Sequence, residues 1–168
     1  ICPGDKTLIC NDAKIAAWAT ENTRFDTVFF GKPSVSGICS DLKFGSRIIS
    51  NTINAKCGTG VITKEWFLLS NPSMKCSQKL TVTSPAFSSS MVVFPGTITL
   101  PTCDIDKATP DILNSKPIVT NTSCRDIGIS FTDQVFPNVS EACIKILRTW
   151  RVIDWCTYQG SQVVAEQV

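Results

Sequence analysis

The chain has 168 residues, of which 43% are hydrophobic, and this is enough to bury the cores of one or two domains. The net charge is +2 and the 16 basic residues are spread along the chain, which excludes an electrostatic patch for DNA or RNA. No apolar run approaches the roughly 18 residues that span a bilayer, and no basic, apolar leader follows Ile1, so we expect a soluble, processed protein without membrane insertion.

The first half of the chain contains one helical pattern among several strand patterns. Asp12 can cap a helix and Trp18 follows with helical spacing, so residues 12–21 predict one or two helical turns. Alternation predicts a central strand in which Ile62, Lys64, Trp66 and Leu68 share one face. The other predicted strands lie at 26–30, 44–53 and 80–83.

The second half of the chain has strand patterns separated by Gly, Pro, Asn and Ser. They lie at 91–94, 97–100, 117–120, 127–131 and 142–156. In the last of these, Arg148, Trp150 and Val152 share a face with Ile144 and Ile146. A tryptophan flanked by aliphatic residues, with a cation at one end, is typical of a central sandwich strand whose basic residue keeps its charge at the rim. Strands spaced by about ten to fifteen residues predict antiparallel β-sandwiches.

The chain contains an internal repeat. Residues 57–76 and 142–156 each contain a basic residue two positions before a tryptophan, an apolar run and a closing cysteine. Such a repeat gives information about the fold of the protein and not about a chemical reaction. It predicts two tandem immunoglobulin-like sandwiches at residues 1–84 and 85–168, with the boundary in the Pro/Ser-rich stretch 84–90.

The nine cysteines and the absence of histidine indicate an oxidising compartment. There is no C-x-x-C pair and no imidazole ligand, so the pattern does not match a zinc site and we expect no bound metal. The cysteines therefore predict a disulfide-stapled, secreted protein that is extracellular or displayed on a cell surface.

Disulfide pairing is predicted from the sandwich architecture, because four cysteines per unit permit three connectivities. A cysteine that ends the first strand lies near one that opens the second-last strand, and a cysteine entering the third strand faces one that leaves the second-last. The predicted pairs are Cys10–Cys57, Cys39–Cys76, Cys103–Cys143 and Cys124–Cys156. Phe94 takes the place of Cys2 in the second unit, so Cys2 is predicted to be unpaired or to bond a neighbouring chain.

A family resemblance covers nearly the whole chain and is strongest in the second unit. The segment K-I-L-R-T-W-R-V-I-D-W-C, the D-Q-V-F element at 133–136 and the opening C-P-G-D-K-T-L-I-C resemble the hyalin-repeat-like, immunoglobulin-like modules of Bacteroidetes surface proteins. In the first unit Lys64-Glu65-Trp66 replaces R-T-W. The resemblance implies export, commonly by the type IX secretion route, and roles as adhesin stalks or surface fibres without catalytic residues.

Three positions are candidates for covalent glycans. Asp26-Thr27-Val28 resembles the O-glycosylation acceptor of Bacteroidetes, which predicts a glycan on Thr27. Asn121 and Asn138 begin N-x-[ST] sequons. In a bacterial protein both sequons are more often turn residues.

The sequence favours a non-enzymatic protein. Without histidine no Ser-His or Cys-His nucleophile pair exists, and no glycine-rich phosphate loop occurs, so we expect no catalytic residue and no cofactor. Asp104 and Asp106 could serve acid-base chemistry or bind calcium, but a solvated turn is the simpler interpretation. Trp66 and Trp150 are predicted to be core residues, whereas Trp18 and Trp155 could form an interface.

The predicted function is structural. A chain of two stapled modules is expected to self-associate end to end into a fibre or adhesin stalk, and the tail 161–168 either closes its own sandwich or is donated to the next subunit. The alternative is an adhesin module whose loops bind a glycan or another surface ligand.

Overall fold

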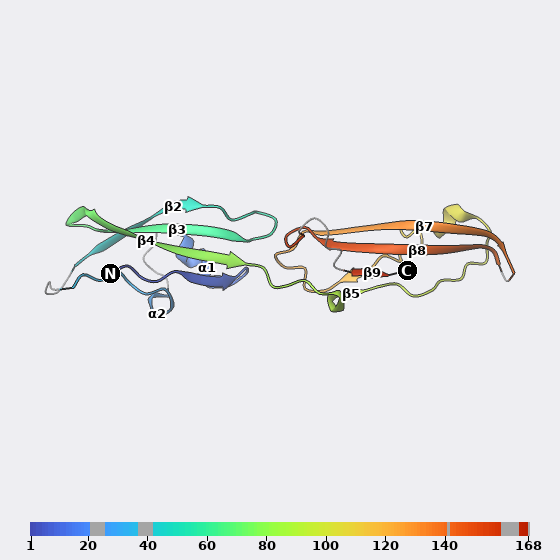
Figure 1. The fold of residues 1–168 in the computed structure, drawn as a ribbon, viewed down its shortest axis with the longest axis horizontal. Coiled ribbons are helices and arrows are strands. Elements are labelled where there is room, and N and C mark those ends of the chain that lie inside the picture. The colour runs from blue at the N-terminus through green and yellow to red at the C-terminus, as the bar shows by residue number, and fades with distance from the viewer. Residues whose placement is uncertain (21–25, 37–41, 141, 159–164, 168) are drawn as a thin grey trace. The chain divides into compact units, whose positions relative to one another are not determined.

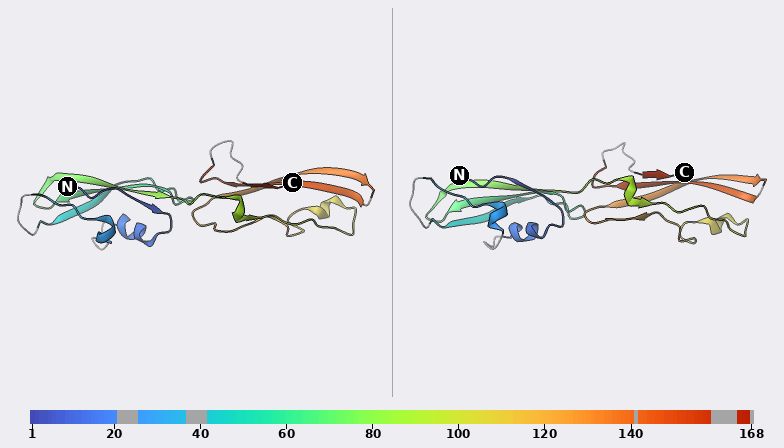
Figure 2. Two further views of the ribbon diagram at one scale, coloured as in Figure 1. Left: turned by 60° about the horizontal axis from the view of Figure 1, so that its bottom comes forward. Right: turned by 90° about the horizontal axis from the view of Figure 1, so that it is seen from below.

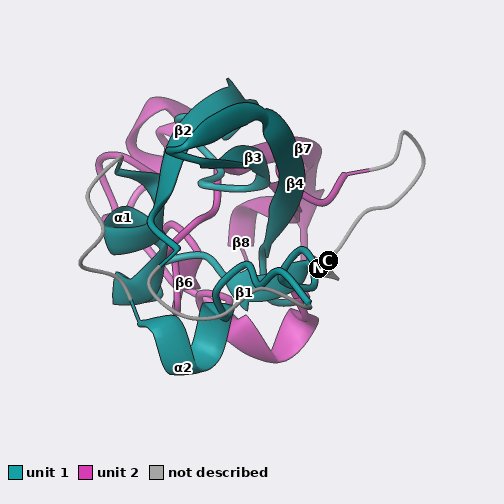
Figure 3. Ribbon diagram, turned by 90° about the vertical axis from the view of Figure 1, so that its left-hand side faces the viewer, with its two compact units in different colours: residues 1–85 teal, residues 86–168 magenta. Residues whose placement is uncertain are grey.

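A computed structural model describes residues 1–20, 26–36, 42–140, 142–158 and 165–167 (Figure 1, Figure 2). The prediction of a mostly β protein is confirmed, because strands dominate the secondary structure and form several sheets. The chain divides into two compact units, Ile1–Pro85 (unit 1) and Ala86–Val168 (unit 2), which are coloured separately in Figure 3. This boundary lies within the predicted Pro/Ser-rich stretch.

Unit 1 is built on one four-stranded sheet with the order β1-β4-β3-β2. Its elements are β1 (Lys6–Ile9), α1 (Ala13–Ala19), α2 (Thr27–Phe30), β2 (Phe44–Asn51), β3 (Gly60–Leu68) and β4 (Asn71–Thr83). The strand β3 pairs antiparallel with β2 and with β4, but β1 pairs with β4 in parallel, from Lys6 opposite Leu80 to Ile9 opposite Thr83. The prediction of purely antiparallel sheets is therefore wrong in this unit.

Two short helices lie against one face of the unit 1 sheet (Figure 2). The carboxylate of Asp12 caps α1 by accepting from the amide of Lys14 at 2.9 Å, as the sequence predicted. The predicted strand at 26–30 is wrong, because Asp26 accepts from the amides of Val28 and Phe29 and so starts a helical turn instead.

The predicted parity of the tryptophan strand is confirmed in unit 1. Ile62, Lys64, Trp66 and Leu68 of β3 are all buried, and Leu80 and Val82 of β4 are buried beside them. Each aliphatic side chain in this layer contributes about 1.5–3 kcal/mol through removal of apolar surface from water. The core therefore follows the period of two that the sequence shows.

Unit 2 consists of a two-stranded and a three-stranded sheet. Its elements are η1 (Ser89–Met91), β5 (Val92–Val93), η2 (Ile105–Ala108), β6 (Ile118–Val119), β7 (Ile127–Val139), β8 (Ala142–Asp154) and β9 (Ala165–Gln167). The strands β5 and β6 pair antiparallel, and the second sheet has the order β7-β8-β9. Val92 and Val152 form the buried core of unit 2, with Phe87, Phe94, Val119 and Ile127 packed against them.

In unit 2 the structure tests the predictions for residues 97–100 and for the tail. The predicted strand at 97–100 does not form. In the predicted tail, residues 165–167 form β9 and pair with β8 of the same chain, while the rest of 161–168 lies outside the described residues. The tail therefore supplies a short closing strand.

Candidate functional site

The core of unit 1 contains a cation held between two indoles. The Nζ atom of Lys64 lies 4.7 Å from the ring centroid of Trp18 and 5.5 Å from that of Trp66, and it donates to the carbonyl of Thr20 at 3.3 Å. Lys64 has no exposed surface, which corrects the expectation that its charged end reaches the rim. Trp18 is equally buried and stacks on Phe30, so it is a core residue and not an interface residue.

The equivalent position in unit 2 is also a cation on aromatic rings. The guanidinium carbon of Arg148 lies 4.6 Å from the ring centroid of Phe131 and 5.8 Å from that of Trp150. Its nitrogens donate twice to Asp133 at 2.7 Å and once to the carbonyl of Ala108 at 2.9 Å. The two units thus use one scaffold, in which a cation two residues before a buried tryptophan joins the strand to the segment that covers it.

Unit 2 contains a buried ion pair that the sequence analysis did not find. The Nη1 atom of Arg125 donates to Asp154 at 2.7 Å, and the two side chains are 1% and 0% exposed. Other nitrogens of Arg125 donate to the carbonyls of Asn121 and Ala86, both at 3.0 Å. Asp154 also accepts from the amide of Cys156 at 3.0 Å. The pair joins the start of the unit to the end of β8.

On the opposite face of the unit 1 sheet, Glu65 is the centre of an ionic cluster. Its carboxylate accepts from Arg47 at 2.6 Å and lies 3.1 Å from the ammonium of Lys75. Hydrogen bonds from Lys75 and Arg47, in that order, lower the pKa of Glu65 below its ordinary value. Only 12% of the Glu65 side chain is exposed, so the two cations cover it.

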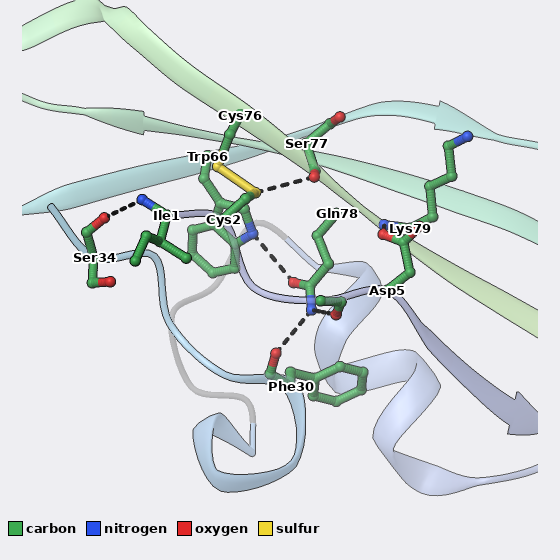
Figure 4. Close-up of a disulfide and its surroundings, with 11 residues drawn as sticks. Ile1, Cys2, Asp5, Phe30, Ser34, Trp66, Cys76, Ser77, Gln78 and Lys79 are labelled. Carbon is green, nitrogen blue, oxygen red and sulfur yellow. Dashed lines mark hydrogen bonds between the residues drawn. A yellow bond between two sulfur atoms is a disulfide. The ribbon is translucent and has the colours of Figure 1, made fainter.

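The N-terminal segment of unit 1 is fastened by a disulfide between Cys2 and Cys76 (Figure 4). This corrects two predictions, since Cys2 is paired within its own unit and Cys76 is not bonded to Cys39. The parallel register explains the correction. Lys6 at the start of β1 lies opposite Leu80, and the same alignment, continued four residues towards the N-terminus, places Cys2 opposite Cys76. The sulfur of Cys2 also contacts the carbonyl of Ser77 at 3.0 Å; a disulfide sulfur has no hydrogen to donate.

Gln78 reinforces this attachment from inside the unit (Figure 4). Its side chain is fully buried, donates to the carbonyls of Gly4 and Phe30 at 2.8 Å, and accepts from the indole nitrogen of Trp66 at 3.3 Å. The amide of Lys79 donates to Asp5 at 2.7 Å. One amide side chain therefore joins the N-terminal segment, the end of α2 and the tryptophan strand.

The remaining cysteines are accounted for as follows. Cys103 is bonded to Cys143, the pair that the strand topology predicted. Cys10, Cys57, Cys124 and Cys156 are all disulfide-bonded, and the pairs Cys10–Cys57 and Cys124–Cys156 stay predictions. Cys39 lies outside the described residues. Each unit is thus stapled, which fits an oxidising environment.

A cavity of about 240 Å³ lies beside the Cys2–Cys76 disulfide. Its walls include Ile1, Phe44, Trp66, Met74 and the disulfide itself. This volume is below the roughly 300 Å³ at which small-molecule sites begin, and we assign no ligand to it.

The glycan candidates lie at accessible positions of the chain. Thr27 is half-buried at the first position of α2, and the neighbouring Val28 is 95% exposed. Asn121 and Asn138 are exposed and have φ values of 53° and 55°, a left-handed conformation that asparagine adopts more readily than most residues. All three candidates are therefore placed where a sugar could be attached, although Asn138 belongs to β7 and not to a turn.

Other polar and aromatic candidates have local roles. The carboxylate of Asp104 accepts from the amide of Asp106 at 3.1 Å and caps η2, so the two aspartates form a turn. Trp155 is 53% exposed and contacts Tyr158 edge-on at 5.2 Å. Within the described residues, no group of three or more metal-ligating side chains is found.

Comparison of the chain with known proteins gives no relative. No protein-family model, curated protein or solved structure matches it. Among the described helices, none is long and apolar enough to cross a membrane.

Proposed function

We propose that this chain is a structural extracellular protein, a repeat-module subunit of a bacterial surface fibre or adhesin stalk. Its two units are immunoglobulin-like, hyalin-repeat-like sandwiches that are stapled by disulfides. The subunits associate end to end with copies of themselves and carry covalent glycans.

The single observation that carries this proposal is the repeated scaffold. Lys64 with Trp66 and Arg148 with Trp150 have the same spacing, a cation two residues before a buried tryptophan, in two disulfide-bonded units. Side chains of this kind hold layers of secondary structure together. The most strongly patterned residues of the chain pack inside both units, and this suits a protein that bears mechanical load.

Light scattering coupled to size-exclusion chromatography tests the proposal with the oxidised protein. The expected result is a mass that rises with concentration in multiples of the 18.3 kDa chain. A single species of monomer mass across the whole concentration range would contradict self-association.

Intact-mass spectrometry of the protein from its native source tests the glycans separately. We expect a mass above that of the bare polypeptide, and a Thr27→Ala variant should lose most of the excess. A paired variant that replaces Asn121 and Asn138 by glutamine is the matched control and should keep it. A native mass of 18.3 kDa would remove all three candidates.

An adhesin module that binds a glycan is the second candidate. The half-exposed Trp155 beside Tyr158 favours it, because an accessible indole can stack on a sugar ring. Oligosaccharide binding that is lost in the Trp155→Ala variant, while self-association persists, would support the adhesin function. Absence of binding in a broad oligosaccharide screen would contradict the adhesin function and leave the fibre as the one proposed function.

A further inference from the structure

The strand β7 is the outermost strand of the three-stranded sheet in unit 2 (Figure 1). The strand β8 lies on one side of β7, and the closing strand β9 pairs with the far side of β8. Among the described residues, no strand pairs with the other side of β7. Every residue of β7 is described, and we call its outer side, from Ile127 to Val135, the free edge of β7.

The register of β7 with β8 determines which backbone groups the free edge presents. The amide of Trp155 donates to the carbonyl of Asp126 at 2.8 Å, immediately before the paired strands begin. Because hydrogen-bonded and non-hydrogen-bonded pairs alternate along an antiparallel ladder, the even-numbered residues of β7 bond to β8. The odd-numbered residues direct their N–H and C=O groups outward, and they are Ile127, Ile129, Phe131, Asp133 and Val135.

The side chains of these odd-numbered residues lie on the face of the sheet that carries the core. Ile129 lies opposite Val152 and Phe131 lies opposite Trp150, and directly opposed residues share a face. Val152 and Trp150 are buried, whereas Ile129, Phe131 and Val135 are 41%, 44% and 42% exposed. The core of unit 2 therefore continues to an apolar edge that is still in contact with solvent.

The matching edge in unit 1 is protected against further pairing. The strand β2 pairs with its tryptophan strand as β7 does, but its register shifts after Ile48, and Arg47 is exposed on it. Bulges and exposed charges are the usual protections of an edge strand. The strand β7 keeps a continuous register as far as Pro137, and its one charged residue, Asp133, is bonded to Arg148. The free edge of β7 thus lacks both protections until the proline.

We propose that the free edge of β7 pairs antiparallel with β7 of a second copy of this chain, about a two-fold axis at Thr132. In this register Ile129 lies beside Val135 of the second copy, and Phe131 lies beside Asp133 of the second copy. The outward backbone groups of both strands then bond to each other, and the exposed aliphatic side chains cover one another.

The charges favour the axis at Thr132. The guanidinium carbon of Arg148 lies 4.6 Å from the ring centroid of Phe131, and its nitrogens donate to Asp133 at 2.7 Å. A carboxylate placed beside Phe131 by the second copy therefore lies next to a cation. A register centred on Phe131 would instead place that carboxylate against Ile129, an apolar side chain.

This inference rests on the proposed self-association and names its contact surface and its partner strand. A two-fold contact uses the same surface on both copies, so it joins chains in pairs. A fibre then requires one further contact, made by another part of each chain.

A charge exchange at the axis tests the register. Thr132 is exposed, and the axis places it opposite Thr132 of the second copy. Thr132→Lys and Thr132→Asp should each weaken association by about fivefold, because like charges directly opposite each other repel. An equal mixture of the two variants should associate at least as tightly as the wild type. A mixture that associates no better than either variant alone would overturn the inference. Ile118→Lys, which changes an exposed aliphatic residue of β6, is the control and should leave association unchanged.

Hydrogen exchange with residue resolution, measured by mass spectrometry, tests the wild-type oxidised protein. In the monomer the amides of Ile129, Phe131, Asp133 and Val135 should exchange fast, and those of the even-numbered residues between them should be protected by β8. At about fifty times the dissociation constant, where roughly a tenth of the protein is monomer, the fast amides should slow by about tenfold. Odd-numbered amides that are already protected in the monomer would overturn the inference.

The two proposals fail differently. Association in which the odd-numbered amides of β7 stay unprotected would overturn this inference and leave self-association standing. Dimers that protect these amides but never grow further would support this inference and contradict the fibre. Absence of association at every concentration would overturn both.

Discussion

Replacing Asp154 by alanine should strongly destabilise unit 2. The substitution removes the carboxylate that lies 2.7 Å from Arg125 and leaves that guanidinium buried without it, since the arginine side chain is only 1% exposed. It also removes the acceptor for the amide of Cys156. Removing one member of a buried ion pair typically costs about 3–5 kcal/mol, which is a large share of the 5–15 kcal/mol that stabilises a domain.

Urea unfolding followed by circular dichroism measures this effect. With a slope of about 2 kcal/mol per molar urea, the midpoint of the unit 2 transition should fall by about 2 M. Asp111→Ala is the control, because its ion pair with Lys116 is exposed and should contribute about 0–1 kcal/mol. Combining Arg125→Met with Asp154→Leu should recover part of the loss. A fall of less than about 0.5 M for Asp154→Ala would refute the reasoning.

Three further predictions concern the disulfide, the ionic cluster and a glycine. Cys2→Ser opens a disulfide with a sequence separation of 74 and should lower the stability of unit 1 by about 4 kcal/mol in the entropic description, as calorimetry can measure; an unchanged transition would contradict the pairing. The lowered pKa of Glu65 implies a stabilisation that is complete above its ordinary pKa and is lost as the pH falls through the folded-state pKa, so Glu65→Gln should flatten the acid limb of stability against pH. Gly128→Ala would place a Cβ atom 2.6 Å from the indole nitrogen of Trp155, which should shift the tryptophan fluorescence and cost about 1 kcal/mol, whereas Gly96→Ala has open space and should change neither.

The tryptophan strands could be predicted because their information is local. Period-two alternation around Trp66 and Trp150 identifies a half-buried strand whatever the topology, and both residues are buried as expected. The mostly β class follows from the same signal. The helical turn at Thr27 could not be predicted this way. Its β-branched residues favour a strand, but two hydrogen bonds from backbone amides to Asp26 stabilise a helical turn instead.

The Cys103–Cys143 pair was predicted correctly, but the pairing of Cys2 depended on information that the sequence does not contain. The pairing of Cys2 follows only from the parallel alignment of β1 with β4, and an antiparallel scheme gives it no partner. The Arg125–Asp154 pair could not be predicted for a similar reason. The two residues are 29 positions apart and meet only because β7 pairs with β8 in a hairpin. The sequence position of a charged residue does not show whether its side chain is buried or which opposite charge it contacts. Both depend on the folded structure.

Electron microscopy of the purified, oxidised protein tests the central claim most directly. We expect filaments with a regular axial repeat, formed at concentrations where light scattering shows a rising mass. Isolated particles of monomer size at every concentration, from a protein whose disulfides are intact, would contradict the claim that this chain is the subunit of a fibre.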